Sequence, residues 1–178
     1  MKNRQKKMTA GKIALYGMFL AAALVAGYIE RLIPVNPGVP GVKLGLSNIV
    51  TMVLLYTAGF QAAALISAAR ILLSGLLFGS GFAMVYSAAG ALLSMIVMVI
   101  LKKTGRFSTV GVSVAGGVFH NVGQILVAIA VLETRSLIYY LPVLILSGLA
   151  AGIVIGILSG VLTRRLEPMI RESLGEGR

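Results

Sequence analysis

The chain has 178 residues, of which 58% are hydrophobic and only 12% charged, yet its formal net charge is +11. It contains no cysteine, which excludes disulfides, a thiolate metal site and a cysteine nucleophile. It contains no Asp and a single His, so carboxylate-bound magnesium chemistry and a multi-histidine metal site are not expected. No GxxxxGK[ST] phosphate loop is present, so we expect neither ATP hydrolysis by that route, nor a cofactor, nor an enzymatic activity of its own.

Long apolar runs dominate the sequence and predict an all-α membrane protein, because a helix needs about 20 apolar residues to cross a bilayer. Six runs are expected to form a six-transmembrane-helix bundle: 13–29, 44–58, 60–79, 82–101, 108–132 and 137–162. The second run is the weakest, since about fifteen residues reach only ~23 Å. The predicted organisation is a basic N-terminal stretch (1–12), a transmembrane domain (13–162) and a C-terminal tail (163–178).

The basic residues are distributed unevenly around these runs. Most of the sixteen Lys and Arg residues precede the first run, separate the fourth from the fifth or follow the sixth, whereas the opposite side has only Arg31, Lys43 and Arg135. The positive-inside rule therefore predicts cytoplasmic termini in a cell-membrane protein. The net charge then reflects topology and contact with anionic membrane lipid, and no nucleic-acid partner is expected. The first run could also be a secretory signal, but its continuation into Glu30 favours a retained helix.

A sparse set of polar residues lies inside the apolar runs. Arg70 is the only charged residue between positions 60 and 79, and a guanidinium at membrane depth costs several kcal/mol, so by default it marks a function. Helical spacing places some of these polar residues on one face of the third run, together with Arg70. It places the others on one face of the fifth run. The candidate ligand site comprises Arg70, Ser67, Ser74, His120, Asn121 and Gln124, with Asn48 and Lys43 on the path from outside.

This polar set has two possible roles. With no acid expected near it inside the membrane, Arg70 predicts a small anionic, partly apolar ligand, because its planar fork suits a carboxylate or phosphate. Alternatively, Asn121 and Gln124 hydrogen-bond neighbouring helices, and Arg70 is neutralised by backbone carbonyls.

Small residues indicate close helix packing. Gly148, Gly152, Gly156 and Gly160 recur at every fourth position of the sixth run, which lets another helix backbone approach, either in this bundle or in a partner. Gly17 and Ala21 form a looser strip on the first run and are candidates for partner docking. The connection 30–43 contains three prolines and is predicted to be a stiff lid over the site or a plain connector.

Several motifs resemble a known family. They are PGVKLGLSNIV at 40–50, RILLSG at 70–75, GVS at 111–113, HNVGQ at 120–124 and YLP at 140–142. Together they resemble the bacterial heptaprenyl diphosphate synthase component I family, also called the Gx transporter family, from about residue 10 to 165. The resemblance implies an architecture similar to the substrate-binding S components of energy-coupling factor transporters, which dock on a transmembrane coupling subunit driven by ATPases.

The family's enzymatic label conflicts with the composition, because a chain without Asp lacks the clustered carboxylates that hold metal diphosphates. We therefore predict a membrane substrate-capture subunit of a small-molecule transporter, working with a coupling subunit and ATPases. The alternatives are a non-catalytic accessory subunit in polyprenyl diphosphate or quinone metabolism, and a purely structural membrane subunit.

Overall fold

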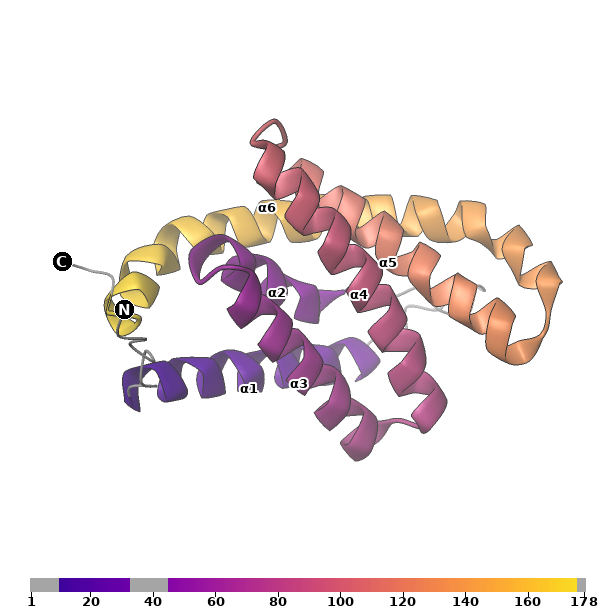
Figure 1. The fold of residues 1–178 in the computed structure, drawn as a ribbon, viewed down its shortest axis with the longest axis horizontal. Coiled ribbons are helices and arrows are strands. Elements are labelled where there is room, and N and C mark those ends of the chain that lie inside the picture. Colours follow the sequence, from indigo (N-terminus) through magenta and orange to yellow (C-terminus); the bar gives the residue numbers. More distant parts are fainter. Residues whose placement is uncertain (1–9, 33–44, 176–178) are drawn as a thin grey trace, which may run out of the picture.

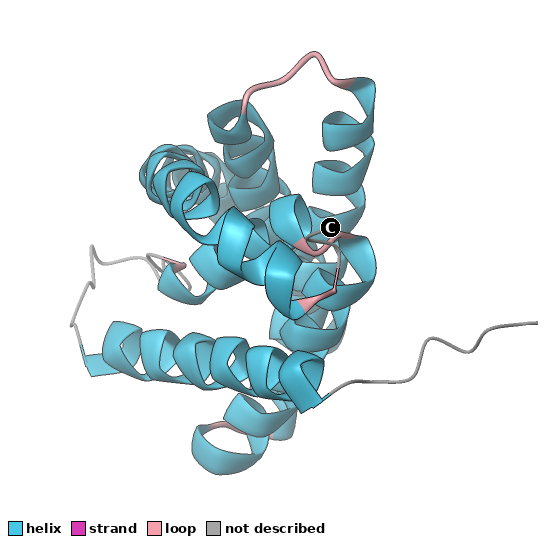
Figure 2. Cartoon of the chain, turned by 90° about the vertical axis from the view of Figure 1, so that its left-hand side faces the viewer, coloured by secondary structure: helices cyan, strands magenta, loops and turns pink. Residues whose placement is uncertain are grey.

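The computed structural model describes residues 10–32 and 45–175, which form six α-helices and one 3-10 helix (Figure 1). Within these residues every element is helical, and short loops join most of them (Figure 2). The elements are α1 (Ala10–Leu32), α2 (Leu46–Thr57), α3 (Phe60–Phe78), α4 (Gly81–Thr104), α5 (Thr109–Leu132), η1 (Arg135–Tyr140) and α6 (Leu141–Ser173). The predicted all-α class with six helices is therefore confirmed.

Five of the six helices are long and apolar enough to cross a membrane, and α2 is not. Its 12 residues extend only about 18 Å, well short of the ~30 Å hydrocarbon core. The other helices instead expose large apolar side chains over much of the molecular surface, as expected for surfaces that face lipid. Five helices of the predicted six-helix bundle are thus of spanning length, and the sixth, α2, corresponds to the run that the sequence marks as the weakest.

The short helix α2 is the centre of the bundle. It packs against α1, α3 and α6, and residues on every side of it are buried, from Val50 to Leu55. Leu54 is fully buried, and Met52 and Val53 are almost so. Because α2 is surrounded by protein, it does not have to match the thickness of the bilayer.

Charged side chains from other helices hold both ends of α2. At the N-terminus, the Glu30 carboxylate of α1 accepts hydrogen bonds from the backbone N–H groups of Gly45 (2.6 Å) and Leu46 (3.1 Å). At the C-terminus, the Lys102 ammonium of α4 donates to the Leu55 carbonyl (2.5 Å). Anions at a helix N-terminus and cations at its C-terminus complement the helix dipole and satisfy groups that the helix leaves unpaired.

The helices α4, α5 and α6 form the most closely packed part of the molecule. A Cβ added to Gly152 of α6 would lie 2.6 Å from the Val114 Cα of α5, and one added to Gly156 would lie 2.7 Å from the Val110 Cα. On the opposite side of α5, a Cβ at Gly123 would lie 2.7 Å from the Ala89 carbonyl oxygen of α4. Glycines therefore bring α5 into backbone contact with both neighbours.

The two termini of the described chain lie at the same end of the bundle (Figure 1). A Cβ at Gly11 in the first turn of α1 would lie 3.6 Å from the Ser173 carbonyl oxygen at the end of α6. The last helix continues beyond the predicted boundary at 162, curves round this end and contains Pro168. Ile170 is fully buried in the core cluster that includes Leu15, so part of the predicted tail packs as a helix on the bundle.

Candidate functional site

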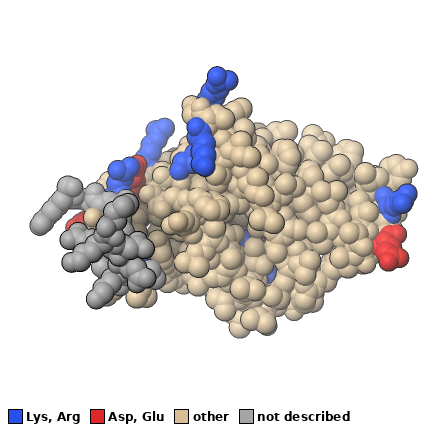
Figure 3. Space-filling view, viewed as in Figure 1, with Lys and Arg blue, Asp and Glu red and all other residues tan. Residues whose placement is uncertain are grey.

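A cavity of about 170 Å³ lies between the helices, and all six contribute to its wall. The α1 and α3 residues around it belong to the C-terminal halves of those helices, so it lies in the half of the bundle remote from the two ends of the described chain. Figure 3 shows that most of the molecular face is uncharged, with one recessed basic patch in its middle. The wall contains the charged side chains of Glu30, Arg31 and Arg70, the amides of Asn48, Asn121 and Gln124, and the imidazole of His120.

Arg70 reaches the cavity from the middle of α3. Its Nε is buried and has no hydrogen-bond partner among residues 10–32 and 45–175. Ser74, one turn further along α3, also lines the cavity, and its hydroxyl donates to the Ile71 carbonyl (3.3 Å). Ser67, one turn before Arg70, is buried but does not line the cavity. Of the three residues that helical spacing puts on one face, Arg70 and Ser74 line the cavity and Ser67 does not.

Glu30 corrects the expectation that no acid lies near Arg70. The carboxylate is at the end of α1, lines the same cavity and interacts electrostatically with Arg70. Its two oxygens also accept the hydrogen bonds from the start of α2 described above. The sequence places Glu30 at the end of the first apolar run, and the packing of α1 against α2 and α3 brings it into the wall of the cavity that Arg70 also lines.

Three polar side chains of α5 face the cavity, and their environments differ. The Asn121 amide donates to the Leu144 carbonyl of α6 (2.6 Å), so this residue fastens two helices together, as one of the two sequence hypotheses proposed. Gln124 is 2% exposed, and its Nε2 has no hydrogen-bond partner within the described ranges. The His120 ring packs on Gly90 of α4, where an added Cβ would lie 3.0 Å from the His120 Cε1. Gln124 therefore lines the cavity as a residue and carries a buried amide donor without a partner in the described part of the chain.

The start of α2 forms another part of the wall. Gly45, Ser47 and Asn48 all line the cavity. Gly45 has a left-handed backbone (φ 74°), and a Cβ there would lie 2.9 Å from an Ile155 methyl group, so both conformation and space favour glycine. Lys43 and most of the predicted 30–43 loop lie outside the described residues.

A rim of aromatic and basic side chains closes the cavity between α1 and α3. Arg31 donates to the Phe78 carbonyl (2.6 Å), and its guanidinium carbon lies 5.6 Å from the centre of the Phe78 ring. The Phe78 ring in turn contacts the Tyr28 ring at a centroid separation of 5.5 Å. The site predicted from the sequence does not include Arg31, Phe78 or Tyr28, because nothing in the spacing of residues along the chain indicates that the end of α1 meets the end of α3.

The small-residue strips have different surroundings. Gly148, Gly152 and Gly156 face α5 of the same bundle, whereas a Cβ at Gly160 would make only ordinary contacts at 4.0 Å. On α1, Gly17 and Ala21 are exposed, and a Cβ at Gly17 would meet nothing within 4 Å. The strip on α6 thus packs inside the bundle, and the strip on α1 lies on its outer surface.

Five long apolar helices around a cavity with two guanidinium groups and amide groups define a multi-pass membrane protein with a polar interior site. The cavity wall has one carboxylate, and no group of three His, Asp or Glu side chains converges in the described part of the chain. The chain belongs to the heptaprenyl diphosphate synthase component I family, whose family model matches residues 19–162. This confirms the resemblance seen in the sequence motifs. Searches of curated proteins and of solved structures find no match.

Proposed function

We propose that this protein is a membrane substrate-capture subunit, similar to the S components of energy-coupling factor transporters, and that it holds a small anionic, partly apolar ligand in the cavity. The observation that carries the proposal is that two residues of one cavity wall, Arg70 and Gln124, each have a buried donor without a partner in the described residues, Nε and Nε2 respectively. Leaving a buried donor unsatisfied costs about 1–3 kcal/mol, and more for a charged group. A bound ligand that accepts from both donors removes that cost.

The charges of the wall favour an anion. Arg31 and Arg70 provide two positive charges and Glu30 one negative charge, and two of the Glu30 acceptor sites are occupied by the backbone of α2. Arg70 presents a guanidinium fork that suits a carboxylate or a phosphate oxygen pair. Gln124 and His120 would add hydrogen bonds from α5, and Asn48 would add one from α2.

The proposal includes partners that supply energy. The sequence has no phosphate loop and no Asp, so concentrative uptake would need a coupling subunit with ATPases. The exposed strip at Gly17 and Ala21 supports a docking surface for a membrane helix. We place both termini in the cytoplasm of a cell-membrane protein, on the basic-residue asymmetry and on the proximity of Gly11 to Ser173.

The test compares Arg70→Ala and Arg70→Lys with the parent in lipid nanodiscs. Small molecules that co-purify with the parent are identified by mass spectrometry, and their binding is titrated against each variant. We expect loss of binding in Arg70→Ala and markedly weaker binding in Arg70→Lys, because a point charge does not reproduce the fork. Arg106→Ala, an exposed basic residue between α4 and α5, is the matched control. Parent-like binding by Arg70→Ala would make Arg70 structural and overturn the proposal.

The family assignment supports a second candidate, a non-catalytic accessory subunit in polyprenyl diphosphate or quinone metabolism. The single carboxylate of the cavity argues against independent metal-dependent prenyl transfer. Affinity purification from the native membrane distinguishes the two candidates. Transporter ATPases among the co-purified proteins favour substrate capture, and a prenyl diphosphate synthase favours the accessory role.

A further inference from the structure

An apolar groove runs along the outside of the bundle between α1 and α3. Its wall consists of Leu24, Val25 and Tyr28 from α1 and Leu77 and Phe78 from α3. Several of these side chains are open to the surroundings, with Leu77 63% and Val25 57% exposed. The tyrosine hydroxyl is the only polar side-chain group in that set, so the groove is suited to hydrocarbon.

The groove and the polar cavity share part of their walls. Leu24, Tyr28 and Phe78 line both of them, and the Tyr28 and Phe78 rings meet at 5.5 Å across the boundary between α1 and α3. The two rings therefore separate the polar cavity from the groove, and side chains of this kind can change rotamer without moving either helix.

We infer that the ligand is a single-chain amphiphilic anion that enters between α1 and α3, with its charged head at Arg70 and its hydrocarbon chain in the α1–α3 groove. This inference rests on the proposed function and specifies its ligand. The rise along α3 from Arg70 to Leu77 is about 10 Å, which a chain of roughly eight methylenes spans. The occupant is assigned because the groove shares three wall residues with a cavity whose lining residues Arg70 and Gln124 carry donors without a partner in the described residues.

We expect the groove to determine where the hydrocarbon chain of the ligand lies more than how tightly the ligand binds. A chain that moves from the bilayer into an apolar groove exchanges one hydrocarbon environment for another, so little hydrophobic free energy is gained. The head gains the pairing with Arg70, while the chain avoids exposure to water during entry. The decisive measurement is therefore the location of the chain end.

The experiment uses the purified protein in nanodiscs with two photoreactive probes, dodecanoate and dodecyl phosphate, each with a terminal diazirine. After irradiation, peptide mass spectrometry locates the adducts. We expect them at residues 24–28 of α1 and 77–78 of α3, with at least tenfold fewer adducts in Arg70→Ala for one or both head groups. Leu77→Trp, which fills the groove, should give a similar loss. Leu76→Trp should not, because Leu76 is 75% exposed and outside the groove wall.

Adducts scattered over lipid-facing helices, adducts independent of Arg70, adducts only on a co-purified membrane partner, or no adducts would each overturn the inference. Circular dichroism of each variant checks that it is folded. Titration with butanoate and inorganic phosphate separates this inference from the proposed function. If these short anions bind in an Arg70-dependent way while the long probes scatter, the groove assignment fails and anion capture stands. If neither probe length depends on Arg70, both proposals fail.

Discussion

Replacing Glu30 with Gln should destabilise the fold and strengthen anion binding at the same time. The carboxylate has two roles in the structure, since it accepts two backbone hydrogen bonds at the start of α2 (2.6 and 3.1 Å) and places a negative charge near Arg70. Gln retains one acceptor oxygen but loses the charge and the second acceptor. The variant should therefore weaken the anchor of α2 and make the cavity more positive.

The magnitude follows from the bonds that are lost. A hydrogen bond to a charged group contributes about 1.5–3 kcal/mol, and the interaction of an anion with a helix N-terminus contributes about 0.3–1 kcal/mol. Because Gln keeps one neutral bond, we expect a net loss of about 2–3 kcal/mol in the free energy of unfolding. For a chain of this size each kcal/mol shifts Tm by roughly 2–4 °C, so the expected decrease is about 4–12 °C.

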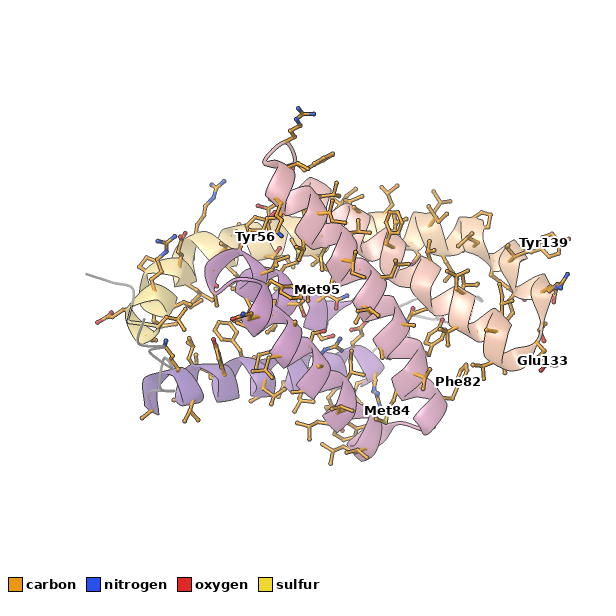
Figure 4. All side chains as sticks on the ribbon, in the orientation of Figure 1. Tyr56, Phe82, Met84, Met95, Glu133 and Tyr139 are labelled. Atoms are coloured by element: carbon orange, nitrogen blue, oxygen red, sulfur yellow. The ribbon has the colours of Figure 1, made fainter. Side chains whose placement is uncertain are left out.

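Thermal unfolding followed by far-UV circular dichroism in nanodiscs measures the first effect, since the chain has no Trp to report fluorescence. Glu133→Gln is the control, because Glu133 is exposed at the tip of the α5–α6 hairpin (Figure 4). Titration with butanoate measures the second effect and should show tighter binding than in the parent. An unchanged Tm relative to the control would refute the capping argument, and weaker anion binding would refute the charge argument.

Three further predictions concern packing, topology and docking. Gly152→Ala should cost about 1–3 kcal/mol, because its Cβ would lie 2.6 Å from a backbone atom of α5, whereas Gly160→Ala meets only ordinary contacts and should leave Tm within a degree or two; equal shifts would contradict the close-packing argument. Reporter fusions at Lys103 and Arg135 should report opposite sides of the membrane, with Lys103 cytoplasmic, and the same side for both would reject the topology. Ala21→Leu should reduce co-purification of a membrane partner without changing ligand binding, and unchanged recovery of the partner would remove α1 as the docking surface.

Local sequence patterns predicted the helices well, because the cost of unpaired backbone groups in lipid forces apolar runs of membrane length to be helical. The start of α3 at Phe60 agrees with the prediction, and the α4 and α5 boundaries differ from it by only a few residues. The faces of α3 and α5 were also predictable, since a 3.6-residue period puts Arg70 with Ser74 and His120 with Gln124. Arg70 itself was recognisable from its isolation in an apolar run.

Helical spacing did not determine how far α2 extends or what surrounds it. An apolar run of fifteen residues reads equally as a weak membrane span or as a buried core helix, and the contacts of α2 with α1, α3 and α6 decide for the second. The charges at its two ends, Glu30 and Lys102, are distant in sequence from the groups that they bind.

Composition and hydrophobic period alone indicate a helical membrane protein with one arginine, Arg70, inside an apolar run and with no Asp. Those conclusions depend on composition and on period, which are local properties of the chain. The packing of the helices is needed to see that Glu30 shares a cavity with Arg70, that Ser67 does not line it, and that Tyr28 and Phe78 lie between it and an apolar groove. These relations depend on how the ends of α1, α2 and α3 meet, and contacts between helices distant in sequence leave no periodic signal within any one of them.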